Sequence, residues 1–362
     1  MAEIYRPTKA EVDLDAIARN LRMIRRSAGD PMVIAVVKAN GYGHGAAEVA
    51  QKTLENGAEM LAVATPDEAL HLRSAGIDAD ILVMGASPVS FIPAAQKNGI
   101  ILTAYSIEWI QQAAAVSGEF RVHLKVDTGM GRIGIQPAEA EEALALLQRT
   151  PFRLEGIFTH FATADTADSP LFREQVAKFK EVLKKTGDGL MVHASNSAAA
   201  LLHPEVSFDA VRAGIAMYGI NPSGYVESEL GSPLQPALTL STEVIHVKKL
   251  PAGSPVSYGA TYRTEQDEWI GTLPIGYADG LLRALQGQDV LVRGERVPIV
   301  GRICMDQCMV RLPREIKPGT PAVLLGMQGD ERIRAEEWAE RLGTIPYEIP
   351  CMLTARIPRF IR

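Results

Sequence analysis

Apolar runs alternate with amphipathic stretches over the first two thirds of the chain. Eight runs are apolar at successive positions, as in strands buried on both faces, and they span residues 33–38, 60–64, 80–85, 101–105, 121–127, 154–160, 190–195 and 208–217. Stretches with a helical period, such as AEAEEALALLQR, separate most of these runs. Eight buried strands alternating with helices predict an α/β fold with a parallel (β/α)8 barrel of the TIM type. The number of strands disfavours the alternative, an open doubly wound sheet.

The pattern changes near residue 222. The stretch NPSGYVESELGSPLQPA is rich in proline, glycine and serine and has no helical period, so we expect a domain boundary there. Beyond it the chain consists of short β-rich runs, and only AEEWAERLG is clearly helical. We therefore predict a barrel domain over residues 1–233 and a smaller, mainly β domain over 234–362, which residues 1–12 can join.

Composition and charge narrow the class of protein. The 362 residues carry a formal net charge of −6 and contain no Lys/Arg block, which argues against a nucleic-acid partner. No run approaches the roughly 20 apolar residues of a membrane span, and residues 1–12 lack the apolar centre of a signal peptide. Cys304, Cys308 and Cys351 are an odd number without zinc-site spacing, so we expect a reducing, cytoplasmic location and no metal.

Lys38 is the most informative residue of the barrel pattern. It follows the first apolar run, and a glycine-rich turn with Tyr42 comes directly after it. The carboxyl ends of barrel strands carry the catalytic groups of such folds. A lysine there either reaches solvent or serves as a nucleophile or base, since desolvation lowers the pKa of an amine.

The ends of the later runs add further polar groups. They are Lys125 and Arg132 in KVDTGMGRIG, His160, Ser197 in HASNS, and Arg212, Gly214 and Ile215 in VRAGIA. Backbone N–H groups after the last strands of a barrel commonly bind a phosphate, and a serine hydroxyl can add to them. A lysine can bond to an aldehyde, and an arginine can donate to a ring nitrogen. Together these groups suit an anionic, aromatic cofactor. For His44 and His193 we expect packing or loop hydrogen bonds.

Nine motifs in the same order resemble bacterial alanine racemases, which are pyridoxal-phosphate enzymes of fold type III. The matching stretches are VVKANGYGHG, KVDTGMGRIG, THFATAD, HASNSAA, VRAGIAMYG, VSYGATY, LPIGYADG, GRICMDQ and PYEIPC. The resemblance covers essentially the whole chain. It implies interconversion of L- and D-alanine by two-base proton transfer at Cα of a pyridoxal 5'-phosphate external aldimine, supplying D-alanine for peptidoglycan. It also implies a cytoplasmic homodimer whose active sites are shared across the interface.

The resemblance assigns a role to each matching residue. Lys38 would hold the cofactor and act as one base, and Tyr258 of the partner subunit would act as the opposite base. The phosphate would be bound by Tyr42, Ser197, Gly214, Ile215 and Tyr347. His160 would lie by the cofactor ring and Arg212 would face the pyridine nitrogen. Arg132 would contact the cofactor's phenolic oxygen or the substrate carboxylate. The partner's Met305 and the partner's Asp306 would help to receive the substrate, and Tyr277 and Tyr347 would narrow the entrance. In many family members the lysine matching Lys125 is carbamylated and orients the arginine matching Arg132.

Other interpretations are less consistent with the sequence. TGMGRIG has the spacing of a dinucleotide-binding loop, but Pro137 and its neighbours delay the helix that such a loop requires. A decarboxylase of similar architecture would place an acidic residue where this chain has Arg212. A cofactor-binding barrel without activity would lack the second domain. The choice of amino acid is less determined than the reaction, because one methylene discriminates by only about 1–3 kcal/mol. Serine and other short amino acids therefore remain candidate secondary substrates.

Overall fold

The computed structural model describes residues 5–362 and divides the chain into two compact units. The barrel unit is Ala16–Gln235, and the β unit joins the described part of Met1–Asp15 to Pro236–Arg362. Residues 1–4 of the segment 1–12 lie outside the described residues.

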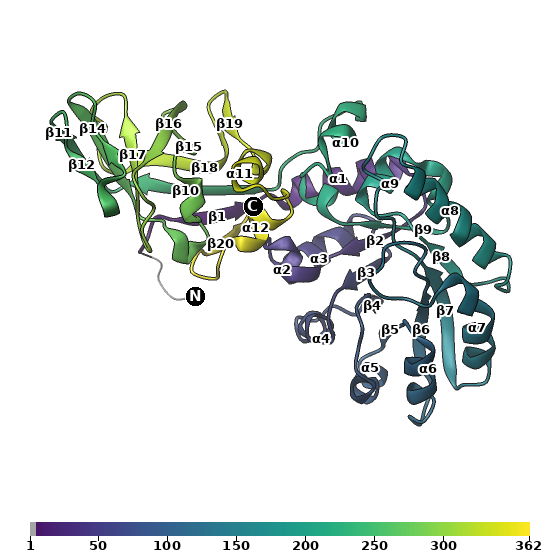
Figure 1. The fold of residues 1–362 in the computed structure, drawn as a ribbon. Helices are drawn as coiled ribbons and strands as arrows, with labels where there is room; N and C mark the ends of the chain where they lie inside the picture. Colours follow the sequence, from purple (N-terminus) through teal and green to yellow (C-terminus); the bar gives the residue numbers. More distant parts are fainter. Residues whose placement is uncertain (1–4) are drawn as a thin grey trace. The chain divides into compact units, whose positions relative to one another are not determined.

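The barrel unit contains a closed barrel of eight parallel strands that neighbour one another in chain order (Figure 1). The strands are β2 (Met32–Val36), β3 (Met60–Val63), β4 (Ile81–Val83), β5 (Ile100–Ala104), β6 (Phe120–Lys125), β7 (Phe152–Phe158), β8 (Met191–His193) and β9 (Ala210–Ala213). The last strand pairs with the first, in a register from Met32 with Ala210 to Ala35 with Ala213, and this pairing closes the ring. The predicted parallel barrel is confirmed.

Helices follow the strands and lie around the outside of the barrel (Figure 1). They are α1 (Leu14–Ser27), α3 (Ala46–Glu55), α4 (Pro66–Ser74), α5 (Ile92–Lys97), α6 (Ile107–Ala113), α7 (Ala140–Gln148), α8 (Pro170–Leu183), α9 (Ser197–Leu202) and α10 (Gly224–Glu229). The short segment α2 (Lys38–Tyr42) comes directly after β2 and has left-handed backbone angles. Helix α1 buries Ile17, Leu21 and Ile24 along one stripe, as its helical period predicts.

Several strands are shorter than the apolar runs that predict them, and two of these shortened ends bear on the site. The first ends at Val36, so that Lys38 lies in the following turn. The last covers only Ala210–Ala213, because the backbone of Gly214 leaves the extended conformation and Ile215–Tyr218 forms a 3-10 turn. Both departures occur at the carboxyl end of the barrel, where the side chains leave the ladder and become available to a ligand.

The β unit is built on a sheet in the order β11-β14-β17-β16-β15-β18-β10-β1-β20, with β19 paired to β18 and a separate β12-β13 ribbon. Its strands are β1 (Lys9–Val12), β10 (Leu238–Val244), β11 (His246–Leu250), β12 (Pro255–Val256), β13 (Tyr262–Arg263), β14 (Glu268–Leu273), β15 (Asp289–Val292), β16 (Glu295–Val300), β17 (Cys308–Leu312), β18 (Thr320–Gln328), β19 (Glu331–Ile333) and β20 (Arg359–Ile361). Helices α11 (Ala335–Leu342) and α12 (Glu348–Met352) complete it. The prediction of a mainly β second part is confirmed.

The amino-terminal strand β1 pairs antiparallel with β10 and parallel with β20, so both ends of the described chain enter this sheet. None of the helices formed by residues 5–362 is both long and apolar enough to cross a membrane.

Candidate active site

Lys38 opens a left-handed turn at the carboxyl end of β2. The four residues after it, Ala39, Asn40, Gly41 and Tyr42, have φ angles of 52°, 53°, 60° and 50°. Asparagine and glycine tolerate this region, but a left-handed alanine or tyrosine costs about 1–2 kcal/mol. A run of strained residues persists only where the surroundings hold it, and such runs concentrate at functional sites.

Hydrogen bonds to the neighbouring elements supply that support. The Glu68 carboxylate accepts the Ala39 N–H at 2.7 Å, and the Asn40 side chain accepts the Ala46 N–H at 3.0 Å. Glu68 also closes the capping box of α4 with Thr65. Sequence reasoning did not single out Glu68. The T-x-x-E spacing of the capping box is the signal that could have found it.

The mouth of the barrel unit holds a cavity of about 280 Å³, near the lower end of the range for small-molecule sites, roughly 300–1,000 Å³. It is lined by Lys38, Ala64, Met84, Gly85, Ala86, Lys125, Arg132, Ile133, Phe158, His160 and Arg212. No carboxylate side chain is among the lining residues of the described chain. This surplus of cations favours a ligand with several negative charges.

Arg212 is the central cation of this site. Its side chain is buried, and Nη2 donates to the carbonyls of Thr159 at 2.8 Å and Ala194 at 2.7 Å. Nη2 also lies 3.1 Å from Nδ1 of His160, and Nη1 lies 2.9 Å from Nδ1 of His193. Burial lowers the pKa of Arg212 to about 9, so the guanidinium stays protonated at neutral pH. Its orientation is fixed from several directions.

A chain of hydrogen bonds continues from Arg212 into the barrel core. Because a guanidinium only donates, Nδ1 of both His160 and His193 must accept. The proton of His193 then lies on Nε2, which is 2.9 Å from Nδ1 of His123 and donates to it. Burial lowers the pKa of His123 to about 3, and burial together with Arg212 holds the pKa of His160 and His193 well below 6.5. All three imidazoles are therefore neutral.

His193 thus belongs to the site, in addition to packing against Phe158 at 4.7 Å between ring centroids. His123 is a member that sequence reasoning missed. Its signal was a polar residue within the apolar run RVHLK, which predicts a buried group that needs a partner. His44 follows the expectation of a loop hydrogen bond, because its Nδ1 lies 3.0 Å from the Tyr42 carbonyl oxygen.

Lys125 lies at the end of β6 with its side chain buried. Its amine donates to the Val126 carbonyl at 3.2 Å and lies 5.2 Å from the ring centroid of Phe158. Burial and the charge of Arg212 lower the pKa of Lys125 to about 7. A large share of this amine is therefore uncharged and nucleophilic at neutral pH.

The loop after Lys125 presents Arg132 to the same cavity. Asp127 holds this loop, since its carboxylate accepts the N–H groups of Gly129, Met130 and Gly131 at 3.0, 2.8 and 3.1 Å. Asp127 therefore orients the loop that carries Arg132.

A second set of predicted residues meets around Gly214. Ser197 Oγ accepts the N–H groups of Gly214 at 3.0 Å and Ala216 at 3.3 Å. A Cβ atom at Gly214 would lie 3.1 Å from the Tyr42 hydroxyl and 3.6 Å from Ser197 Oγ, so a side chain would fill the space between the two hydroxyls. Ile215 is buried beside them. Two hydroxyls and successive backbone amides around a small space suit a phosphate group.

The other predicted residues lie in the β unit, where hydrogen bonds join three loops. The N–H groups of Tyr277 and Ala278 each donate at 3.0 Å, to the carbonyls of Cys304 and Met305 respectively. The Ser257 hydroxyl, next to Tyr258, donates to the Arg302 carbonyl at 2.5 Å. These contacts gather the motifs VSYGATY, LPIGYADG and GRICMDQ, which are distant in sequence.

The gathered loops expose their large side chains. Tyr258 is 71% exposed, Met305 53% and Tyr277 38%, and Asp306 is exposed beside them. Tyr347 belongs to the same unit and lies directly before α12. The structure therefore assembles the predicted residues as three sets, one around the barrel cavity, one around Gly214 in the barrel unit and one on the β unit.

The closed barrel, the lysine at its mouth and the cation-lined cavity define a (β/α)8-barrel enzyme with a separate β unit. Two family models match nearly the whole chain, the alanine racemase N-terminal domain over residues 12–222 and the alanine racemase C-terminal domain over residues 237–361. The chain belongs to the alanine racemase family, as the nine motifs predict.

Individual relatives agree with this membership. The alanine racemase of Geobacillus stearothermophilus is 50% identical over 366 residues, covering 99% of this chain and 94% of the relative. The crystal structure of alanine racemase from Bacillus anthracis with bound L-Ala-P has a TM-score of 0.95 at 48% identity, covering 100% of this chain and 96% of that one. A histidine racemase from Leuconostoc mesenteroides has a TM-score of 0.92 at 30% identity, covering 99% of each chain. Proteins named for different amino acids therefore share this fold.

Proposed function

We propose that this protein interconverts L- and D-alanine with pyridoxal 5'-phosphate bound in the barrel unit. The observation that carries the proposal is the cavity at Lys38, whose cations match an anionic cofactor and the carboxylate of an amino-acid substrate. The small space at Gly214, between the hydroxyls of Tyr42 and Ser197, suits the phosphate of that cofactor. When bound, the cofactor supplies an electron sink for the pair released from Cα. The product D-alanine would serve peptidoglycan synthesis.

In this proposal each residue of the site has its own role. Lys38 holds the cofactor through its amine and moves a proton on one face of Cα. Tyr42, Ser197, Gly214, Ile215 and Tyr347 bind the phosphate. His160 lies by the cofactor ring. Arg212 keeps its protons on Nη1 and Nη2, so a ring nitrogen that faces it accepts a hydrogen bond and gains no proton. Arg132 contacts the cofactor's phenolic oxygen or the substrate carboxylate, and the partner's Met305 and the partner's Asp306 help to receive the substrate.

Tyr258 of the partner subunit moves the proton on the opposite face. A tyrosine has an ordinary pKa near 10, so ionising it at pH 7 costs about 4 kcal/mol, which nearby cations must offset. The hydrogen bond between Arg212 and His160 is the first link of a hydrogen-bonded chain through which the charge of Arg212 would stabilise the ionised tyrosine. We propose that His160 extends this chain to Tyr258 of the partner subunit.

Exposed side chains of the β unit support the proposed homodimer. Tyr258, Tyr277 and Met305 are large side chains that the β unit leaves exposed on tied loops, an arrangement typical of a surface that another subunit covers. In the dimer, Tyr277 and Tyr347 would narrow the entrance to the site. A cytoplasmic location is part of the proposal, and the free thiols of Cys304, Cys308 and Cys351 agree with it.

The reaction is tested by incubating the purified protein and pyridoxal phosphate with L-alanine in deuterated water. We expect deuterium at Cα and loss of optical rotation. Release of carbon dioxide would instead support a decarboxylase, and the absence of both would support a binding protein. Serine and histidine, run beside alanine, measure how strictly the site selects its substrate.

Lys125 is proposed to carry a carbamate that orients Arg132. The lone pair of its uncharged amine attacks the carbon of CO2, an N–C bond forms as one C=O π bond opens and its electron pair moves to oxygen, and one N–H proton leaves to water. Its pKa of about 7 and its place beside the same cavity as Arg132 support this step.

With ¹³C-bicarbonate we expect a carbamate resonance in the wild type that is absent in Lys125→Ala. The same variant should raise the KM for alanine about tenfold, as for the loss of a charged hydrogen bond. Lys184→Ala, which changes an exposed lysine, is the matched control. A resonance that survives Lys125→Ala would place the carbamate elsewhere.

A further inference from the structure

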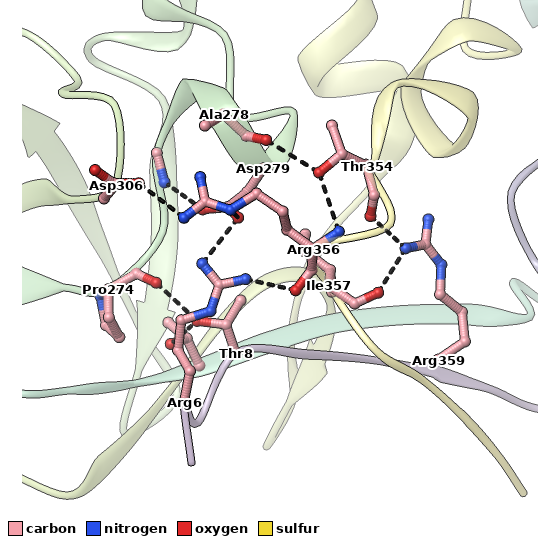
Figure 2. A network of polar contacts seen from close by, with 12 residues as sticks. Arg6, Thr8, Pro274, Ala278, Asp279, Asp306, Thr354, Arg356, Ile357 and Arg359 are labelled. Carbon is pink, nitrogen blue, oxygen red and sulfur yellow. Dashed lines mark hydrogen bonds and ion pairs between the residues drawn. The ribbon is translucent and has the colours of Figure 1, made fainter. Parts of the chain in front are cut away.

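A buried carboxylate lies beneath the tied loops of the β unit. Asp279 is completely buried, and Figure 2 shows the guanidinium groups of Arg6 and Arg356 beside it. Its Oδ1 accepts from Arg6 at 2.8 Å and lies 3.6 Å from Nε of Arg356, while Oδ2 accepts the Gly276 N–H at 3.1 Å. A buried carboxylate is tolerated only with such partners. Asp279 is therefore a fixed anchor for both arginines.

Arg356 connects this anchor to the surface. Its Nη2 donates to Oδ1 of Asp306 at 2.8 Å (Figure 2). Its backbone is also fixed, because the Arg356 carbonyl accepts from Arg6 at 2.8 Å. One arginine side chain thus lies between the buried Asp279 and the exposed Asp306. The two arginines and two aspartates balance in charge.

The loops that meet at this arginine leave little room for movement. A Cβ atom at Gly276 would lie 2.3 Å from the Cys304 carbonyl oxygen and 2.4 Å from that of Met305, so only glycine fits there. Thr354 donates to the Ala278 carbonyl at 3.0 Å, which joins the segment before Arg356 to the same loops. The loop bearing Met305 and Asp306 is therefore held at its backbone by Gly276 and its neighbours, and at its acidic side chain by Arg356.

We propose that Arg356 is a positioning residue for substrate entry, which holds the Asp306 carboxylate and neutralises it where the carboxylate of the amino-acid substrate arrives. This inference rests on the proposed function, which places Asp306 among the residues that receive the substrate. Without Arg356, Asp306 keeps its charge but loses its partner, and it repels the substrate carboxylate. Asp279 keeps its bond to Arg6, so the β unit retains its buried anchor.

The test compares kinetics and amide exchange in the full-length holoenzyme. Arg356→Met is expected to raise the KM for L-alanine about fivefold, the scale of a partly exposed charge pair, with kcat within about twofold. Asp306 is itself among the residues that receive the substrate, so Asp306→Asn alone is the reference for the double variant. Adding Arg356→Met to Asp306→Asn should raise KM by less than about twofold, because the charge that Arg356 neutralises is already absent. Arg356→Lys should give a KM between those of the wild type and Arg356→Met. An ammonium keeps the charge but does not contact Asp279 and Asp306 at the same time, as the guanidinium does.

Hydrogen exchange supplies a readout independent of catalysis. The amides of Tyr277 and Ala278 should exchange about tenfold faster in Arg356→Met, because the loop that accepts their hydrogen bonds is released. Arg314→Met removes the same charge from an exposed pair with Glu295 and should change neither measurement.

Three results would overturn the inference. They are an unchanged KM with unchanged exchange, an equal rise of KM in Arg314→Met, and a rise of KM from Arg356→Met that is as large in Asp306→Asn as in the wild type. If the wild type does not interconvert alanine, the proposed function fails, and the exchange measurement still decides whether Arg356 holds the loop.

Discussion

Lys38→Ala is expected to abolish alanine racemisation, with a loss of about 10⁴-fold or more, because one side chain supplies both the covalent hold on the cofactor and one of the two bases. The left-handed turn and its contacts with Glu68 are expected to remain, since they involve backbone atoms of the turn and not the Lys38 amine. The measurement is racemisation by chiral chromatography, combined with deuterium uptake at Cα from solvent. Borohydride treatment gives a second readout, because it fixes the cofactor to the wild-type chain and should not fix it to the variant.

The matched control is Lys97→Ala, which removes an exposed lysine at the end of α5. It should retain wild-type activity and cofactor labelling. Borohydride labelling that persists in Lys38→Ala would show that another lysine holds the cofactor, and Lys125 would then be the first to examine because burial lowers its pKa to about 7.

Tyr258→Phe is expected to lower the rate of proton abstraction from L-alanine by about 10² to 10⁴-fold, as for the loss of a general base. Abstraction from D-alanine should be affected less, because Lys38 is proposed to work on the other face. The phenyl ring preserves the shape of the exposed loop and removes only the hydroxyl. The measurement is the loss of the α-deuterium from each enantiomer, followed separately in water.

Tyr262→Phe offers a control with the same chemical change four residues away. Its hydroxyl donates to Glu268 at 2.5 Å within the β unit, so its loss should not distinguish the two enantiomers. Equal effects of Tyr258→Phe on abstraction from L- and D-alanine would contradict the two-base assignment. An effect of similar size in Tyr262→Phe would show that the loop, and not the Tyr258 hydroxyl, sets the rate.

The barrel and the position of its site could be read from the sequence. Buried parallel strands leave continuous apolar runs, and the closed ring brings the carboxyl end of every run to one mouth. Lys38, Lys125, Arg132, His160 and Arg212 could therefore be assigned to one cavity before any coordinates were known. The mainly β character of the second part followed from its short runs in the same way.

The detail of the site depended on contacts that a linear pattern does not encode. The left-handed turn after Lys38 includes Ala39 and Tyr42, which do not favour that conformation. Only the tertiary contact with Glu68 and the neighbouring packing hold it. The chain from Arg212 through His193 to His123 joins three different strands, and a single buried histidine in a strand gives no indication of its partner.

The β unit shows the same limit. The motifs at Tyr258, Tyr277 and Asp306 could be recognised one by one, yet their connection through Gly276, Asp279 and Arg356 could not. Periodicity and strand-end position are properties of neighbouring residues, so the sequence by itself determined the architecture and the candidate chemistry. Which polar groups pair across the fold depends on how distant segments come together on folding. Only the tertiary structure therefore decided the orientation of Arg212, the lowered pKa of Lys125 and the partner of Asp306.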